Sequence, residues 1–262
     1  MPETDLSLLV TAAEKAGEIG LRFFRADPKV WDKGGDAGPV TEADLAINAH
    51  LVAALRQARP DYGWLSEETE DSEDRLVTET QFVVDPIDGT RAFVEGSENW
   101  AIALATVTQG APQTAVVYLP AKGLLFAAAR GDGATLNGKP LAVSSLATCD
   151  GATVLSNKPS FQNAPWTDGT PPAGLERHFR SSLAYRLCLV AQGRFDAMMT
   201  MRRTWEWDIA AGALIVAEAG GTALDIQNQP LVFNNPHPQV NGVIAGGAVA
   251  VHIRASLTRD NA

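Results

Sequence analysis

The sequence predicts a mixed α/β protein, because helical and strand-like patterns alternate along its 262 residues. One observation is the helical spacing of apolar residues from Asp5 to Arg25. The other is a series of short apolar runs separated by glycine and proline turns, among them Trp100–Val107 and Thr114–Leu119. Helical stripes and strand runs in one chain are typical of sheets covered by helices.

The first part of the chain predicts two helices and one strand. After the helix of Asp5–Arg25, a polar, glycine-rich loop follows at Lys29–Pro39. A second helix begins at Thr41, and Pro60 closes it because proline cannot continue a helix. Tyr62–Leu65 is a short strand signal, and a cluster of acidic residues follows it.

The rest of the chain mixes strands and helices. Turns with glycine separate the strand runs like hairpin loops, and a pair of glycines terminates the longest helical run. The predicted strands are Trp100–Val107, Thr114–Leu119, Leu124–Ala129, Thr153–Ser156, Phe195–Thr200 and Val240–Ala245, and the predicted helices are Ser182–Gln192, Trp207–Ala219 and Val249–Leu257.

The length allows one large domain or two fused halves. We expect a single domain over residues 1–262 with two subregions, about 1–145 and 146–262. The boundary between them is expected near Ala142–Gly151, where the strand-rich first half gives way to the second mixture of elements.

A proline-interrupted strand stands at the centre of the chain, in the stretch FVVDPIDGTRAFVEG of residues 82–96. Three apolar residues predict a buried strand that Asp85 ends, because Pro86 has no N–H group for the ladder. Gly89 can adopt backbone angles that other residues rarely reach, and Thr90 is a suitable start for a turn or short helix. We therefore expect a rigid turn at the exit of a strand.

Two kinds of charge fit this turn. The carboxylates of Asp85 and Asp88 suit hard divalent cations such as Mg²⁺, which prefer oxygen ligands. The N–H groups of Gly89 and Thr90 point where a phosphate oxygen could be bound. A plain Asx turn explains the same residues, so the segment alone leaves a metal site and an ordinary turn equally open.

Charge and hydropathy exclude several classes of partner. The net charge of −10 argues against a nucleic-acid polymer or an anionic membrane as the main partner. No apolar run reaches the ~18–20 residues of a membrane span. The acidic N-terminus carries no secretory signal pattern, so we expect a cytoplasmic protein.

Three further carboxylates lie at predicted element boundaries. Asp44 and Asp208 fall in the first turns of helices, where a negative charge also meets the helix dipole favourably. Glu67 follows a strand and also fits a solvated acidic loop. Each has an ordinary explanation when it is taken alone, so their order along the chain carries the argument.

That order resembles the inositol monophosphatase family of metal-dependent phosphomonoesterases. The matching motifs are VTEAD at Val40–Asp44, SEE at Ser66–Glu68, DPIDGT at Asp85–Thr90, and WD with a later AGG at Trp207–Asp208 and Ala219–Gly221. The resemblance implies a sugar-phosphatase fold, a layered αβαβα sandwich that is usually dimeric. It also implies two or three Mg²⁺ ions, inhibition by lithium, a metal-binding and catalytic first half, and a substrate-side second half.

The resemblance assigns a role to each matching residue. It implies that Mg²⁺ is held by the side chains of Glu67, Asp85, Asp88 and Asp208 and by the carbonyl of Ile87. Thr90 and Asp44 match a pair that helps to orient or deprotonate the attacking water, and Glu67 shares that role. The residues matching Asp88, Gly89 and Thr90 also contact the substrate, and Lys33 falls at the position of a mobile-loop lysine near a metal.

The sequence indicates less clearly which residues contact the alcohol part of the substrate. Ser182 and Leu183 match a segment that lies against the substrate, but Thr200 stands where the inositol enzymes place a glutamate against the ring hydroxyls. Arg203, beside Arg202, could bind a second phosphate. The expected substrate is an inositol or sugar phosphate, with 3′-phosphoadenosine 5′-phosphate and histidinol phosphate as alternatives.

Two other classes of function stay open at this point. Some relatives of this family contact RNA polymerase and act in transcription independently of catalysis, but all expected metal ligands are present in this chain, which favours retained catalysis. A structural Ca²⁺ domain is disfavoured, because such sites usually draw their ligands from one contiguous loop. A small phosphate monoester as ligand and a homodimer as assembly are the partners that we expect.

Overall fold

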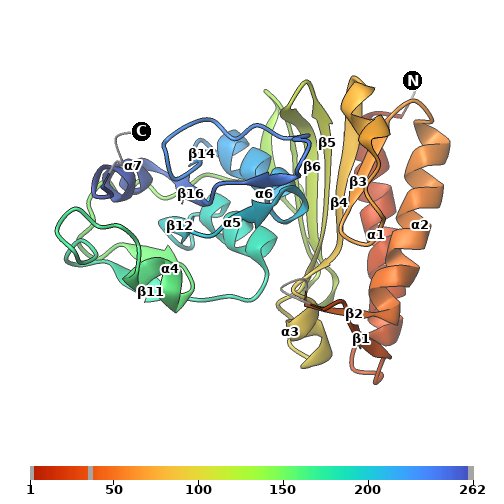
Figure 1. Cartoon of the computed structure of the whole chain (residues 1–262), viewed down its shortest axis with the longest axis horizontal. Helices are drawn as coiled ribbons and strands as arrows, with labels where there is room; N and C mark the ends of the chain where they lie inside the picture. The colour runs from red at the N-terminus through yellow and green to blue at the C-terminus, as the bar shows by residue number, and fades with distance from the viewer. Residues whose placement is uncertain (1–2, 35–37, 259–262) are drawn as a thin grey trace.

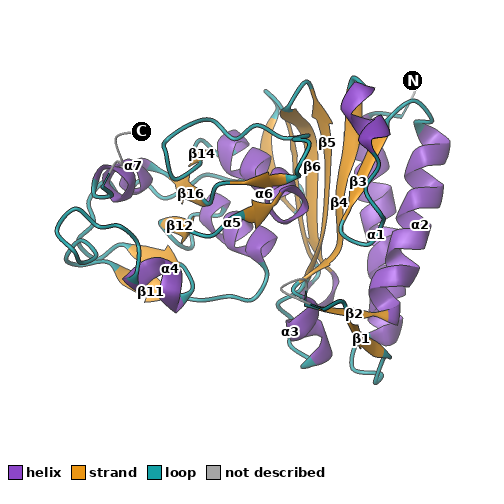
Figure 2. Ribbon diagram, in the orientation of Figure 1, coloured by secondary structure: helices purple, strands orange, loops and turns teal. Residues whose placement is uncertain are grey.

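The computed structural model describes residues 3–34 and 38–258 and arranges them in five alternating layers (Figure 1). Helices α1 (Asp5–Phe23) and α2 (Glu42–Ala58) cover one face of a large sheet, and α5 (Leu183–Ala191) and α6 (Glu206–Glu218) cover the other. A smaller sheet lies beyond α5 and α6, with α7 (Ala248–Ala255) on its outer side. Figure 2 shows the same alternation of helix and strand layers, as the mixed pattern predicts.

The large sheet contains seven strands in the order β3-β4-β5-β6-β7-β8-β9. Strands β3 and β4 are parallel, and every later neighbour in this sheet is antiparallel. Their bounds are β3 Gly63–Ser66, β4 Thr80–Asp88, β5 Ala101–Thr108, β6 Ala111–Leu119, β7 Leu124–Ala129, β8 Gly133–Leu136 and β9 Lys139–Pro140. The two short connections that follow β5 and β6 make this part of the sheet a meander.

The smaller sheet contains five strands in the order β11-β10-β12-β16-β14. Strand β10 is parallel to both of its neighbours, whereas β16 is antiparallel to both of its own. Their bounds are β10 Thr153–Leu155, β11 Glu176–His178, β12 Ala197–Thr200, β14 Thr222–Leu224 and β16 Val243–Gly246. Short pairs complete the described strands: β1 (Val30–Asp32) with β2 (Pro39–Thr41), and β13 (Thr204–Trp205) with β15 (Gln239–Val240).

Three apolar cores fill the layer boundaries, and one of them surrounds α5 and α6 and reaches both sheets. In β4, Phe82 packs toward α1 and α2, and Val83 packs toward α5 and α6, so alternate residues of one strand serve two cores. Burial on both faces explains why β4 is a continuous apolar run rather than an alternating one. A third core, which includes Trp166 and Ile253, lies between the smaller sheet and the outer helices α4 (Lys158–Gln162) and α7. No helix in the described ranges is both long and apolar enough to cross a membrane.

Three details of the sequence prediction were wrong. The last predicted strand, Val240–Ala245, is divided between β15 and β16, which belong to different sheets. Strand β4 does not end at Asp85; it runs to Asp88, with a register shift between Asp85 and Asp88. The ladder skips Pro86 and Ile87 and resumes at Asp88, so proline distorts the strand without ending it. The segment predicted as a loop contains the β1–β2 pair, and residues 35–37 of that segment lie outside the described residues.

Candidate metal centre

Three carboxylates meet where the large sheet faces the central helices. Asp85 and Asp88 stand at the end of β4, and Asp208 stands in the first turn of α6. One oxygen of each lies within 4.8 Å of the others, a spacing at which a single metal ion could contact all three. Asp85 is 1% exposed, and among the described residues neither of its carboxylate oxygens has a hydrogen-bond partner. A buried carboxylate with no partner is costly, so this site fits a cation.

The backbone of the central turn requires glycine. Gly89 has a φ of 99°, in the left-handed region that side chains other than glycine rarely adopt. A Cβ atom at this position would lie 3.1 Å from the carbonyl oxygen of Asn99. The turn therefore leads directly from Asp88 into α3 (Thr90–Val94) and leaves room for the chain that passes beside it.

Helix α5 fixes the orientation of Asp88. The Ser182 hydroxyl and the Ala184 amide donate hydrogen bonds to Asp88 Oδ2 over 2.7 and 2.6 Å. Ser182 also caps α5, because its Oγ accepts from the Tyr185 amide at 3.0 Å. Of the two residues expected against the substrate, Ser182 thus contacts a carboxylate of the centre, and Leu183 is buried in the adjacent core.

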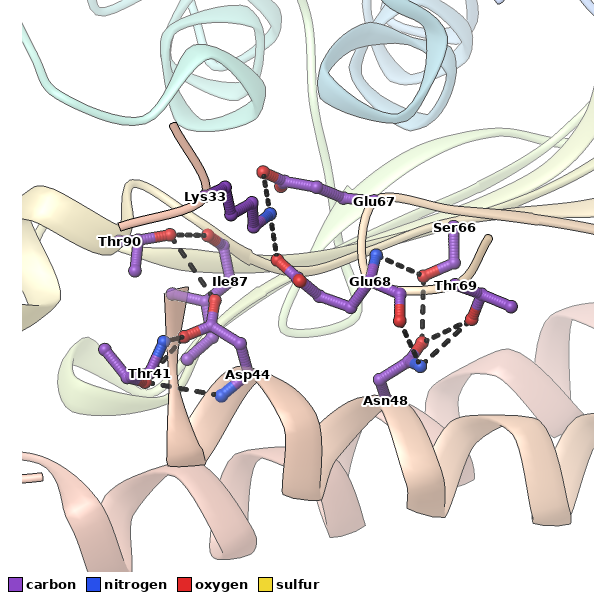
Figure 3. A network of polar contacts seen from close by, with 10 residues as sticks. All are labelled: Lys33, Thr41, Asp44, Asn48, Ser66, Glu67, Glu68, Thr69, Ile87 and Thr90. Carbon is purple, nitrogen blue, oxygen red and sulfur yellow. Dashed lines mark hydrogen bonds and ion pairs between the residues drawn. The ribbon is translucent and has the colours of Figure 1, made fainter. Parts of the chain in front are cut away.

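Helix α2 brings Asp44 to the same turn. Asp44 Oδ2 accepts from the Thr41 amide at 2.8 Å, and Thr41 Oγ1 accepts from the Asp44 amide at 3.4 Å, so the two residues form a capping box; the Thr41 hydroxyl also donates to Asp44 Oδ2 at 2.5 Å. The Thr90 hydroxyl lies 3.1 Å from the Ile87 carbonyl oxygen and 3.4 Å from Asp44 Oδ1 (Figure 3). The structure therefore brings together the Thr90–Asp44 pair that the sequence predicts.

Glu67 is placed differently from the three aspartates. The ammonium of Lys33 lies 2.9 Å from Glu67 Oε1 and 2.5 Å from Glu68 Oε1, and it bridges these two carboxylates (Figure 3). Glu67 is not part of the three-carboxylate group. Its charge nevertheless reaches Asp85 and Asp208, where it raises the pKa of both carboxyls.

The sequence analysis missed Asn48, which holds the turn that carries Glu67. Its Nδ2 donates to the Glu68 carbonyl at 3.1 Å and to Thr69 Oγ1 at 3.0 Å, and its Oδ1 accepts from the Ser66 hydroxyl at 2.8 Å (Figure 3). Residues four apart share one face of a helix, so Asn48 points the same way as Asp44. The four-residue spacing between Asp44 and Asn48 is the sequence signal that could have identified Asn48 as a residue of the site.

The acidic centre holds more negative charge than its surroundings neutralise. Burial raises the pKa of Asp44 to about 6 and the pKa of Glu67 to about 7. Burial and the neighbouring carboxylates hold the pKa values of Asp85 and Asp208 well above their usual range. Burial also raises the pKa of Asp88, although its bonds from Ser182 and Ala184 oppose the shift. A divalent cation would relieve this repulsion.

The predicted residues of the alcohol side lie further along the chain. Thr200 is buried in β12, and no hydrogen bond within the described ranges joins its side chain to the acidic centre. Arg202 and Arg203 are both exposed in the segment between β12 and β13. Arg202 lies close enough to Asp208 for its charge to lower the pKa of that carboxyl.

Comparison with known proteins agrees with this geometry. The profile of the inositol monophosphatase family matches residues 1–257. A histidinol-phosphatase of Chlorobaculum parvum is 34% identical over 236 residues, covering 88% of this chain and 89% of that protein. A protein of Pseudomonas aeruginosa named Nus factor SuhB is 35% identical over 237 residues, covering 84% of each chain.

Solved structures support the same assignment. The structure of an IMPase from Thermotoga maritima superposes with a TM-score of 0.81 at 28% identity, covering 96% of this chain and 95% of that one. The layered fold, the acidic centre and the family profile therefore agree along nearly the whole chain. The chain belongs to the inositol monophosphatase family, and the relatives named histidinol-phosphatase and inositol monophosphatase support a phosphomonoester hydrolase.

Proposed function

We propose that this protein is a Mg²⁺-dependent phosphomonoesterase acting on a small phosphorylated alcohol. The observation that carries the proposal is the buried carboxylate of Asp85, which has no hydrogen-bond partner in the part of the chain that the structure describes and lies beside Asp88 and Asp208. All the donors are oxygens, which suits Mg²⁺. Asp85, Asp88 and Asp208 would hold two or three ions together with Glu67 and the Ile87 carbonyl. When bound, such ions lower the pKa of water and stabilise a leaving alkoxide.

The protein's own groups would divide the remaining tasks. The Thr90 hydroxyl is in contact with the Asp44 carboxylate. Because the pKa of Asp44 is about 6, this carboxylate can accept a proton through the Thr90 hydroxyl near neutral pH. The amides of Gly89 and Thr90 would bind phosphate oxygens and hold the phosphoryl group for in-line attack. Glu67 joins this set only when its carboxylate exchanges Lys33 for another cation.

The proposed substrate is an inositol monophosphate or a related sugar phosphate. Relatives named histidinol-phosphatase and inositol monophosphatase support the phosphomonoester class and leave histidinol phosphate as an alternative. A 3′(2′),5′-bisphosphate nucleotidase acting on 3′-phosphoadenosine 5′-phosphate is the other alternative, and Arg202 beside Asp208 favours it. The homodimer, the lithium sensitivity and the cytoplasmic location belong to the same proposal.

A phosphate-release assay tests the proposal. We expect release to require Mg²⁺, to fall in the presence of Li⁺, and to drop at least a thousandfold in Asp85→Asn. Asp168→Asn is the matched control, because Asp168 is exposed and lies outside the acidic centre. A screen of inositol phosphates, 3′-phosphoadenosine 5′-phosphate, fructose 1,6-bisphosphate and histidinol phosphate would identify the alcohol.

A second class of function would give a different result. Relatives named Nus factor SuhB raise the possibility of a non-catalytic, RNA polymerase-binding regulator of this fold. Such a regulator would release no phosphate from any substrate of the screen, with or without Mg²⁺. Equal activity of Asp85→Asn and the wild type would also contradict the proposed role of the acidic centre.

A further inference from the structure

The carboxylate of Asp208 has no contact of its own that orients it. The backbone of Asp85 is held by its pairing with Ala103 in the β4–β5 ladder, and the side chain of Asp88 accepts from two donors at the start of α5. In the described part of the chain, no hydrogen bond reaches the carboxylate of Asp208. Its direction is therefore set by the backbone that carries it, which is the first turn of α6.

The usual device that fixes the start of a helix is missing from α6. Its N-cap residue is Trp205, whose side chain makes no capping hydrogen bond. Serine, threonine, asparagine and aspartate are preferred at this position, because their side-chain oxygens accept from the first free amides of the helix. Helices α2 and α5 have such caps in Thr41 and Ser182. The start of α6 therefore depends on contacts from outside the helix.

Glu206 provides these outside contacts. It is the first residue of α6, and it is 0% exposed. Its Oε2 accepts from the Asn234 amide at 2.7 Å, and its Oε1 accepts from the Asn235 amide at 2.9 Å and from Asn235 Nδ2 at 2.7 Å. The amide of Glu206 donates to the Pro238 carbonyl at 3.0 Å. Together these bonds fasten the first residue of α6 to the segment before β15.

A buried carboxylate at this position requires an explanation, because burying a charge is costly. No ion pair joins Glu206 to a lysine or arginine within the described ranges. Both of its oxygens face N–H donors, and only an ionised carboxylate accepts at both. Hydrogen bonds to a charged acceptor are about twice as strong as neutral ones. Glu206 therefore holds the first turn of α6 more firmly than a neutral side chain would.

The two acidic residues of this turn face different ways. Successive residues of an α-helix are rotated by about 100°, so Glu206 and Asp208 point in nearly opposite directions from the helix axis. Glu206 reaches the segment before β15, and Asp208 reaches Asp85 and Asp88. Fixing the first side chain therefore fixes the direction of the second.

We propose that Glu206 is a positioning residue for the metal centre, which directs Asp208 toward the ions by holding the first turn of α6. The inference rests on the proposed Mg²⁺-dependent function. Glu206 contacts neither of the other aspartates and is not part of the three-carboxylate group. Residues that orient a metal ligand contribute about ten- to hundredfold to metal affinity. We therefore expect loss of the Glu206 carboxylate to weaken metal binding while every ligand remains in the chain.

Mn²⁺ binding, followed by electron paramagnetic resonance, tests the proposal without requiring turnover. Glu206→Ala removes every contact of the carboxylate and should raise the Mn²⁺ dissociation constant about tenfold. Glu206→Gln should raise it less, because its amide oxygen can keep the bonds from Asn235 while its amide nitrogen faces the Asn234 amide. The Mg²⁺ concentration for half-maximal phosphate release should follow the same order, with kcat largely restored at saturating Mg²⁺.

Asp196→Ala is the matched control. Asp196 also accepts from a comparable set of donors, the Ser144 hydroxyl at 2.5 Å and the Thr153 amide and hydroxyl at 2.8 and 2.7 Å. These bonds join β10 to the residue before β12 in the smaller sheet, outside the acidic centre. We expect this variant to lower the Tm, as Glu206→Ala does, but to bind Mn²⁺ as tightly as the wild type at a temperature at which all variants are folded.

The outcomes separate positioning from folding. Mn²⁺ affinities of both Glu206 variants equal to that of the wild type overturn the proposal, and so does equal weakening in Asp196→Ala and Glu206→Ala. If Glu206→Ala does not fold, Asn235→Ala decides, because it removes one side-chain donor from Glu206 and should still weaken Mn²⁺ binding. A wild type that binds no Mn²⁺ and releases no phosphate would instead overturn the proposed function itself.

Discussion

At the residue scale, the acidic centre depends on side chains that are expensive to bury. Within residues 3–34 and 38–258, Asp85 has no hydrogen-bond partner for either carboxylate oxygen, whereas Asp88 is oriented by two donors at the start of α5. The motif DPIDGT predicts that Asp85 and Asp88 come together, because they are three residues apart on one turn. It cannot predict the contact of Lys33 with Glu67 and Glu68, because that contact depends on how a loop folds back over the site.

The raised pKa values predict how the metal-free protein responds to pH. Asp44 moves from its usual 3.8 to about 6, and Glu67 from 4.5 to about 7. A carboxyl whose pKa is raised by folding stabilises the fold when it is protonated. This stability is fully present below about pH 4 and is lost as the pH rises to about 7. For Asp44 alone the loss is on the order of 3 kcal/mol.

Urea unfolding in the presence of a chelator measures this effect. We expect the free energy of unfolding of Asp44→Asn to fall less between pH 4.5 and pH 7.5 than that of the wild type, and Mg²⁺ to stabilise the wild type most at the higher pH. The comparison of the two proteins removes the contribution of the other carboxylates. If the free energy of unfolding changed equally with pH in the two proteins, folding would not raise the pKa of Asp44.

At the element scale, α2 serves the site at two points one turn apart. Asp44 contacts the central turn, and Asn48 binds the turn that carries Glu67. Its capping box and its closing proline make the existence and the start of α2 predictable from sequence. The distortion of β4 was not predictable, because proline usually ends a strand and only the pairing of Asp88 with Ala101 carries the ladder onward.

Asn48→Ala tests whether the contacts of α2 matter for the metal site. The change leaves the Ser66 hydroxyl and the Glu68 carbonyl without their partner, which should cost about 1–3 kcal/mol of stability. We also expect the Mg²⁺ concentration for half-maximal phosphate release to rise several-fold, because the turn holding Glu67 loosens. Mn²⁺ binding measured by electron paramagnetic resonance should weaken in parallel.

Ser72→Ala provides the control for that experiment. The Ser72 side chain, like that of Asn48, bonds a backbone group, since it accepts from the Asp74 amide at 3.2 Å, but Ser72 is exposed and caps a different helix, η1 (Glu73–Val77). It should cost no more than about 1 kcal/mol and leave the Mg²⁺ dependence unchanged. If Asn48→Ala lowers stability but leaves metal binding as in the wild type, Asn48 supports the fold and not the centre.

At the scale of the whole molecule, two sheets share a central pair of helices, and the acidic centre lies where they meet. The strands of the large sheet end at Pro140, and those of the smaller sheet begin at Thr153, close to the predicted boundary near Ala142–Gly151. Helix α6 nevertheless packs on the large sheet while it carries Asp208 to the centre. Periodicity predicts such elements one by one. It cannot predict which distant loops close around them.

The η1 region and the loop before β15 are two segments far apart in the sequence that contact each other in the fold. Arg75 donates to both oxygens of Asp71 at 2.6 and 2.8 Å and to Asn234 Oδ1 at 2.7 Å, although 159 positions separate Arg75 from Asn234. Glu206, the first residue of α6, accepts from the amides of Asn234 and Asn235 at 2.7 and 2.9 Å. This network therefore fixes the end of α6 that presents Asp208.

Arg75→Met tests whether the network stabilises the whole molecule. Methionine fills part of the space but donates no hydrogen bonds, so Asp71 and Asn234 lose their buried partner. We expect a loss of roughly 3 kcal/mol and a fall in Tm of roughly 6–12 °C. The control is Lys15→Met, since the Lys15–Glu18 pair is exposed and its loss should leave the Tm nearly unchanged. Equal Tm values for the two variants would mean that the Arg75 network adds nothing beyond a surface ion pair, and α6 would then owe its position to apolar packing alone.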